Sequence, residues 1–205
     1  MARSMGLDVI VRPLFELRPM SWSVDQPDSY DAVFITSSNA LTLNNSSFSN
    51  LCKLPALCVG ETTADAARRA GFVNLLIGDR GAAQLAEMAA SKGYRHLLWL
   101  CGEPHGELSH PDLTFDVKIT YQTPAIEWSA DDRHCLERPL VALLHSPRAA
   151  QRFAGLVSDS RAIEIVAISE KAALAAGPGW AGVHWPATPT DDAMLALAAP
   201  LCRAD

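Results

Sequence analysis

The sequence predicts an α/β protein with two doubly wound parallel-sheet lobes joined by a two-stranded β hinge. Short apolar runs alternate with helical segments of small residues, at the spacing of parallel β-α-β units. This alternation occurs twice, before and after a β-rich stretch at residues 115–125 that Pro124 ends. We therefore expect the stretch to cross from one lobe to the other.

The first series of elements lies between residues 32 and 101. Its strands are expected where the apolar runs are continuous, as in strands covered on both faces: residues 32–36, 56–59, 73–77 and 96–100. Helices are expected at residues 38–43, 62–70 and 81–92, with Gly71 and Gly93 as C-terminal caps. Residues 44–50 have the composition of a loop.

The second series follows the crossing stretch. Strands are expected at residues 140–144, 164–168 and 182–185, and helices at residues 131–136, 147–157, 170–176 and 191–201. Pro147 would occupy the first position of its helix, where a missing N–H costs nothing.

These elements give a discontinuous domain organisation. Lobe I is expected to comprise residues 1–18 and 122–205, lobe II residues 19–121, and the hinge strands about residues 11–18 and 116–124. Pro13 restricts the first hinge strand to an edge or crossing position. Residues 2–6 have the pattern of the last turn of a helix capped by Gly6. We therefore expect lobe I to lack its first strand. Either the natural product begins upstream of Met1, or this form folds with a gap in lobe I and has little activity.

Composition narrows the class of protein. The chain has 205 residues, 49% hydrophobic and 20% charged, with a net charge of −6, which argues against nucleic acid as a partner. No apolar run approaches the roughly 20 residues that span a bilayer, and no signal peptide is visible. The five cysteines are odd in number and lack Cys-x-x-Cys spacing, which argues against disulfides and against a metal site. A cytoplasmic protein is expected.

The common catalytic motifs are missing, and we interpret the scattered histidines as surface or core residues. Instead, a small polar turn follows nearly every predicted strand. In open parallel sheets ligands bind outside these strand ends, where the following helix attracts anions. For any single turn, a helix cap is the better explanation. Taken together they favour a ligand with several carboxylates, bound at Thr36, Ser37, Ser38, Gly60, Thr62, Cys101, Gly102, Ser146, Pro147, Ser169, Lys171, Pro189 and Thr190.

An ordered series of short motifs along the chain resembles the uroporphyrinogen-III synthase family. The motifs are Pro13-Leu14-Phe15-Glu16, Phe34-Ile35-Thr36-Ser37, Val59-Gly60-Glu61-Thr62-Thr63-Ala64, Val117 to Thr123, His145-Ser146-Pro147 with Ala150, Ala167-Ile168-Ser169 with Ala172, and Pro189-Thr190. The resemblance implies a cofactor-free monomer with its active site in a cleft between two lobes. It implies hydroxymethylbilane as the substrate, whose eight carboxylates suit the polar turns.

The resemblance also implies a role for Tyr121, which matches the family tyrosine proposed to help the substrate hydroxyl leave. An aromatic residue anchoring the hinge explains Tyr121 equally well. Family members begin with a strand, an Arg-Pro turn and a helix, whereas this sequence starts where that helix ends. Two alternatives therefore stay open: an N-terminally truncated or inactive paralogue, and a two-lobed protein that binds a small anion.

Overall fold

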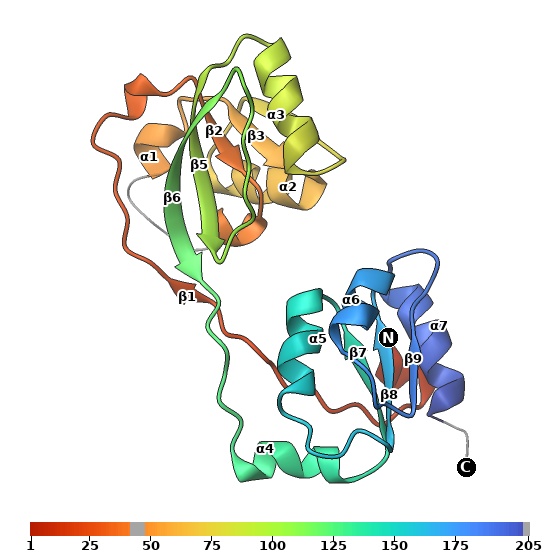
Figure 1. Cartoon of the computed structure of the whole chain (residues 1–205). Helices are drawn as coiled ribbons and strands as arrows, with labels where there is room; N and C mark the ends of the chain where they lie inside the picture. The colour runs from red at the N-terminus through yellow and green to blue at the C-terminus, as the bar shows by residue number, and fades with distance from the viewer. Residues whose placement is uncertain (42–47, 203–205) are drawn as a thin grey trace. The chain divides into compact units, whose positions relative to one another are not determined.

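The computed structural model describes residues 1–41 and 48–202, and the chain divides into two compact α/β units. Unit 1 comprises Met1–Phe15 and Ala125–Asp205, and unit 2 comprises Glu16–Pro124. Unit 2 contains a sheet that is mostly parallel, and unit 1 contains a separate parallel sheet (Figure 1). The α/β class predicted from the sequence is thus confirmed.

Over the described residues, the sheet of unit 2 has six strands in the order β1-β6-β5-β2-β3-β4. They are β1 (Arg18–Pro19), β2 (Ala32–Ile35), β3 (Ala56–Val59), β4 (Leu75–Gly78), β5 (His96–Glu103) and β6 (Thr114–Gln122). Only β1 is antiparallel to its neighbour. The chain moves outward from β2 to β4 and returns to place β5 on the other side of β2, so the winding reverses between β2 and β5.

The helices of unit 2 cover the two faces of this sheet (Figure 1). The first face packs on α2 (Glu61–Ala70), α1 (Phe48–Leu51) and the 3₁₀ turn η3 (Ser38–Leu41); another 3₁₀ turn, η2 (Pro27–Ser29), precedes β2. The second face packs on α3 (Ala82–Ser91) through Leu85, Ala86 and Ala89. Alternate residues of β5 enter the two cores, with Leu98 and Leu100 on the first face and Leu97 and Trp99 on the second.

Two sequence expectations in this unit need correction. The predicted helix at residues 38–43 is a 3₁₀ turn through Leu41, and residues 42–47 lie outside the described part. The predicted loop at 44–50 contains the start of α1, because Phe48 and Leu51 are buried one helical turn apart. Trp22 packs edge-on against Phe48, with ring centroids 5.3 Å apart.

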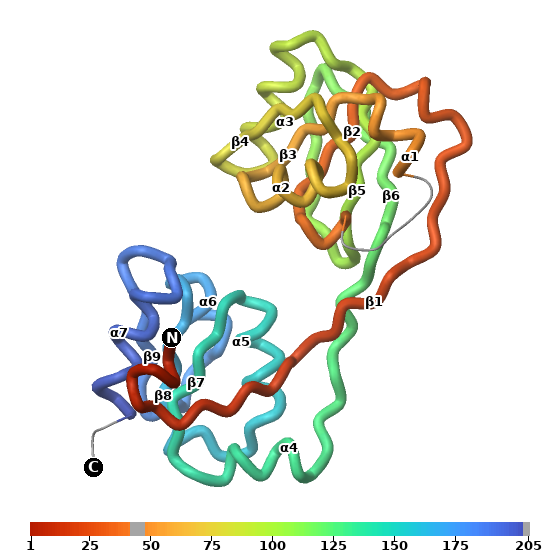
Figure 2. Tube along the Cα trace, turned by 180° about the vertical axis from the view of Figure 1, so that it is seen from behind, coloured from red at the N-terminus to blue at the C-terminus, as the bar shows by residue number. Residues whose placement is uncertain are grey.

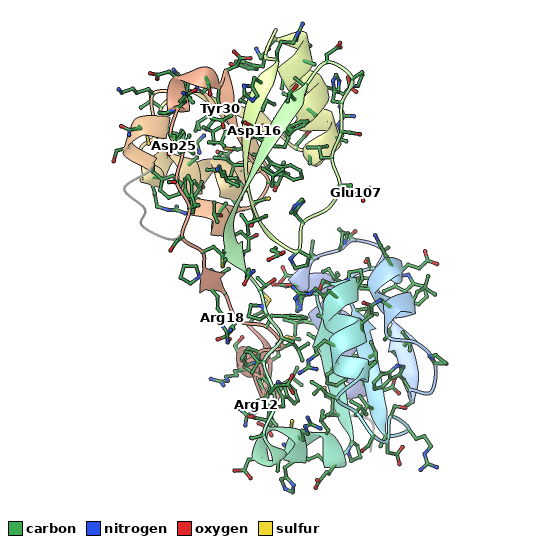
Figure 3. All side chains as sticks on the ribbon, turned by 60° about the vertical axis from the view of Figure 1, so that its left-hand side comes forward. Arg12, Arg18, Asp25, Tyr30, Glu107 and Asp116 are labelled. Carbon is green, nitrogen blue, oxygen red and sulfur yellow. The ribbon has the colours of Figure 1, made fainter. Side chains whose placement is uncertain are left out.

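Polar contacts hold the amino end of β5 and β6. Tyr30 and Asp116 point toward one another in Figure 3, and the Tyr30 hydroxyl donates a 3.0 Å hydrogen bond to Asp116. Burial and this bond raise the pKa of Tyr30. The Asp31 carboxylate accepts hydrogen bonds from the backbone amides of His96 (2.9 Å) and Arg95 (2.7 Å), which lower the pKa of Asp31.

The described strands of unit 1 form a parallel sheet in the order β7 (Leu140–Leu144), β8 (Ile163–Ala167) and β9 (Gly182–His184). Its helices are α4 (Ala130–His134), α5 (Pro147–Ala154), α6 (Glu170–Ala175) and α7 (Asp191–Leu201), with 3₁₀ turns η1 (Ala2–Met5) and η4 (Cys135–Glu137). Phe153 of α5 and Ala172 of α6 pack on one face of the sheet, and Met194 of α7 packs on the other. Gly6 adopts the left-handed cap conformation that the sequence predicted (φ 78°).

The chain passes between the units twice, at Phe15/Glu16 and at Pro124/Ala125. The two passing segments pair antiparallel (Figure 2), as Arg18↔Gln122 and Pro19↔Tyr121 in unit 2 and as a bridge between Phe15 and Ala125 in unit 1. The expected hinge strand at 11–18 is therefore much shorter. Pro13 cannot donate a ladder hydrogen bond, and its carbonyl instead accepts one from Trp128 Nε1 at 3.0 Å.

In the part of the chain that is described, no helix is long and apolar enough to cross a membrane.

Candidate functional site

The carboxyl ends of β2 and β5 lie side by side where the winding of the unit 2 sheet reverses. In open α/β sheets this point is the usual ligand site, because the loops that leave the two strands diverge there. Thr36 follows β2, and its hydroxyl accepts a 3.2 Å hydrogen bond from Trp99 Nε1 of β5. Ser37 comes next, and its hydroxyl accepts from the backbone amide of Asn39 at 3.2 Å. Ser38 begins η3.

Tyr121 lies beside this point, at the carboxyl end of β6. It pairs with Gly102 of β5 and is 9% exposed, within the core that faces α2 and η3. Its hydroxyl makes no hydrogen bond with a described residue. Among those residues, the side-chain polar atom that is both buried and without a hydrogen-bond partner is Arg152 Nε. Since the Tyr121 hydroxyl also lacks a partner but is not buried in this sense, it is in contact with solvent. A phenol hydroxyl in this position can donate a hydrogen bond to a ligand.

Cys101 and Gly102 do not form the predicted polar turn. Both lie within β5, which continues to Glu103 because β6 pairs with it along its whole length. Cys101 is 1% exposed, and burial raises the pKa of its thiol to about 11. Cys101 and Gly102 therefore belong to the strand that pairs with β6 beside Tyr121, and they do not offer the free backbone amides of a turn.

The turn after β3 is also less suited to an anion than predicted. Gly60 precedes α2 and Thr62 is exposed in its first turn, as expected. However, Glu61 lies between them at the start of the helix, where its carboxylate interacts favourably with the helix dipole. Arg68 binds this carboxylate at 2.6 Å. An incoming carboxylate would therefore meet a negative charge at this helix end.

Three of the predicted residues in unit 1 are helix N-caps at the carboxyl edge of its sheet. The hydroxyls of Ser146, Ser169 and Thr190 accept hydrogen bonds from amides in the first turns of α5, α6 and α7, at 3.0, 3.4 and 3.3 Å. Pro147 occupies the first position of α5, as predicted. A hydroxyl that accepts from an amide still has its own proton to donate. Each cap can therefore also donate a hydrogen bond to a carboxylate.

A histidine-aspartate pair joins two of these strand ends. His145, directly after β7, lies 3.0 Å from Asp191 at the start of α7, measured from Nε2 to Oδ1. Sequence reasoning dismissed His145, because its partner is 46 residues away and no spacing motif links the two. Lys171 and Pro189 are exposed beside Ser169 and Thr190.

Arg148 adds a positive charge at the first turn of α5 and stacks over the Phe15 ring at 4.0 Å. Within unit 1 the carboxyl edge thus combines hydroxyl donors and basic side chains with acidic side chains in the first turns of α6 (Glu170) and α7 (Asp191 and Asp192). Groups of three metal-ligating side chains do not occur among the described residues. By fold this is an α/β protein in which three hydroxyl N-caps lie at the carboxyl edge of the unit 1 sheet.

The family model described as uroporphyrinogen-III synthase HemD matches residues 1–196, so the chain belongs to the uroporphyrinogen-III synthase family. The match supports uroporphyrinogen-III synthase activity as the function of the chain. It favours neither an inactive paralogue nor a small-anion binding protein. A search of curated proteins finds no match.

A solved structure with a high TM-score supports the fold. The crystal structure of uroporphyrinogen-III synthetase from Helicobacter pylori 26695 is similar, with a TM-score of 0.70 and 19% sequence identity, covering 92% of this chain and 91% of that one. The uroporphyrinogen III synthase of Thermus thermophilus aligns with a TM-score of 0.40 and 13% identity, over 99% of this chain and 93% of that one.

Proposed function

We propose that this chain closes hydroxymethylbilane into uroporphyrinogen III, inverting the last pyrrole ring, and that it works as a cytoplasmic monomer without a cofactor. The reaction would make it a hydro-lyase, since one molecule of water is lost. The observation that carries the proposal is the family match over residues 1–196.

The chemistry requires a leaving group and a fixed geometry. The C–O bond of the hydroxymethyl group breaks, the oxygen leaves as water after taking up a proton, and the pyrrole nitrogen donates electrons to form an azafulvene. The substituted carbon of the terminal ring then attacks this azafulvene and gives a spiro intermediate. The bond from that carbon to its original methylene bridge breaks, the bridge carbon bonds to the unsubstituted α-carbon of the same ring, and that carbon loses its proton, which completes the inversion. Tyr121 is the proposed hydrogen-bond or proton donor to the departing hydroxyl, which supports its loss.

The remaining task is to hold a flexible chain with many carboxylates in one folded shape. Orientation of this kind contributes several kcal/mol to catalysis. In this proposal the hydroxyl protons of Ser146, Ser169 and Thr190 bind substrate carboxylates at the edge of the unit 1 sheet, and Lys171 adds charge. In unit 2 the contacts are at Thr36, Ser37 and Ser38. Gly60 and Thr62 are proposed contacts as well; Glu61 lies between them, as Glu170 follows Ser169 and Asp191 follows Thr190.

The test is the isomer that the full chain makes from hydroxymethylbilane. The product is oxidised to porphyrin, and the III and I isomers are separated by chromatography. Isomer III in excess over an enzyme-free control is expected. Formation of isomer I alone, by a folded protein, would refute the proposal.

A further inference from the structure

An irregularity in the β5-β6 ladder lies beside Tyr121. The two strands pair in parallel register from His96↔Thr114 to Cys101↔Ile119, and the next pair is Gly102↔Tyr121. Thr120 is therefore an extra residue in β6, as in a β-bulge. The ladder then resumes at Glu103↔Gln122. The position of Tyr121 is thus fixed by regular pairing on both sides of the bulge.

The bulge changes the face of the sheet on which Tyr121 lies. Side chains of a regular strand alternate, so Tyr121 would share a face with Phe115 and Ile119, which belong to the core beside α3. Instead Tyr121 belongs to the core on the opposite face, with Leu98 and Leu100 of β5. One inserted residue therefore moves the phenol from one face of the sheet to the other.

Thr120 is held on both sides. Its hydroxyl donates to the carbonyl oxygen of Cys101 at 3.2 Å, and the side chain is 2% exposed. Its own carbonyl accepts a hydrogen bond from the Met20 amide at 2.9 Å. Buried polar groups are costly when unpaired, so these two bonds stabilise the bulge against an unbulged register.

Gly102 provides the space that the ring occupies. A Cβ added to Gly102 would lie well under 3.0 Å from three atoms of the Tyr121 ring, a separation that real Cβ atoms essentially never show. The nearest of these atoms is Cζ, which carries the hydroxyl. The reactive end of the phenol thus lies directly over the backbone of Gly102.

We propose that the Thr120 bulge and the absent side chain of Gly102 are a positioning device that sets the Tyr121 hydroxyl at the reacting group. The inference rests on the proposed function, in which Tyr121 assists departure of the substrate hydroxyl. Thr120 and Gly102 act only through Tyr121 and touch no substrate.

The test uses the full chain with Gly102→Ala and Thr120→Val, each made alone and in a Tyr121→Phe background. The added methyl group would overlap the outer atoms of the Tyr121 ring, so the ring must move from its place over Gly102. Thr120→Val keeps the shape of the side chain and removes only the hydroxyl, which makes it the second route if Gly102→Ala fails to fold. Thr114→Val is the matched control, because Thr114 is exposed at the other end of β6.

The readouts are kcat and KM for isomer III, together with the melting temperature. With Tyr121 present, Gly102→Ala and Thr120→Val are each expected to lower kcat by about 10-fold or more. This loss is a part of the 10²–10⁴-fold that a general acid supplies. KM is expected to stay within about twofold, and Thr120→Ser, which retains the hydroxyl, should restore kcat. In the Tyr121→Phe background neither substitution should lower kcat further, because no hydroxyl remains to be positioned.

Equal losses in the two backgrounds would overturn the proposal, since they would show general damage to the fold. Unchanged kcat in both single variants would overturn it as well. If Tyr121→Phe alone kept full kcat while the unsubstituted chain made isomer III, the positioning role would fail and the proposed reaction would stand. If the unsubstituted chain made only isomer I, the reaction and the positioning role would fail together.

Discussion

Removing the Tyr121 hydroxyl is expected to lower catalysis while leaving stability almost unchanged. In Tyr121→Phe the ring keeps its place over Gly102, and no hydrogen bond to a described residue is lost. The free energy of unfolding should therefore change by less than about 0.5 kcal/mol, as for substitutions that remove no buried contact.

The expected loss in kcat is about 10²-fold, at the lower end for general acid assistance, because hydroxymethylbilane also cyclises without help. This loss corresponds to about 2.7 kcal/mol of transition-state stabilisation. It exceeds the expected stability change several-fold, so an effect on folding cannot be mistaken for it.

The assay measures the initial rate of isomer III formation at saturating substrate, the fraction of isomer I, and thermal unfolding. Tyr94→Phe is the matched control, because Tyr94 is half-buried in the same unit but precedes the amino end of β5. A kcat within twofold of the unsubstituted chain would refute the role of Tyr121. A large drop in melting temperature would refute the packing on which the reasoning rests.

Three further predictions concern other parts of the chain. His145 precedes Ser146 at the strand-end edge proposed to bind substrate carboxylates, so His145→Ala should raise KM several-fold with kcat nearly unchanged. His134→Ala removes a similar exposed histidine-carboxylate pair away from that edge and should leave both constants unchanged. Asp31→Asn should cost about 1 kcal/mol at pH 7, a value reduced for solvent exposure, with the difference from the parent disappearing as the pH falls below about 4. The Cys58 thiol, whose pKa burial raises to about 11, should resist alkylation at pH 8, whereas exposed Cys202 should react.

Each of these predictions has a contradicting result. Equal KM values for the two histidine variants would show that His145 does not contact substrate. The pH dependence expected for Asp31 follows from its lowered pKa. The folded state binds the Asp31 proton less tightly than the unfolded state does, so the ionised Asp31 carboxylate stabilises the fold at pH values above the unfolded pKa. A destabilisation by Asp31→Asn that grew as the pH fell through 4 would contradict this. Mass spectrometry that found Cys58 modified as fast as Cys202 would contradict its burial.

Regular elements could be predicted from the sequence wherever local signals agreed. The apolar runs of β2, β3 and β7 were predicted within one residue of their observed ends. Ser146 followed by Pro147 correctly predicted the start of α5. The Ser146 hydroxyl accepts a hydrogen bond from a backbone amide of the first turn, and Pro147 occupies the first helical position, where no N–H is needed. In these cases burial on both faces and helix capping act within a few residues, so a local pattern contains the information.

The geometry of the candidate site could be predicted only in part. Alternation along β6 places Tyr121 on the wrong face, because the bulge depends on contacts of Thr120 with Cys101 and Met20, which are far away in the sequence. The pairing of His145 with Asp191 likewise depends on the order of strands in the sheet and not on spacing. The predicted turn at Cys101 and Gly102 was wrong because the pairing of β6 extends β5 beyond its apolar run.

The discontinuous make-up of unit 1 has a consequence for synthesis on the ribosome. Unit 2 is one uninterrupted segment, and all its strands are available once Pro124 has left the exit tunnel. The first fifteen residues can pack only later, because their contacts in unit 1 come from residues that are synthesised later. Trp128 Nε1 donates a hydrogen bond to the Pro13 carbonyl, and the Arg148 guanidinium stacks over the Phe15 ring. We therefore expect unit 2 to fold first during translation, with its two ends paired through β1 and β6. This early pairing would keep the N-terminal segment close to the part of the chain from Ala125 onward, which completes unit 1 as it leaves the ribosome.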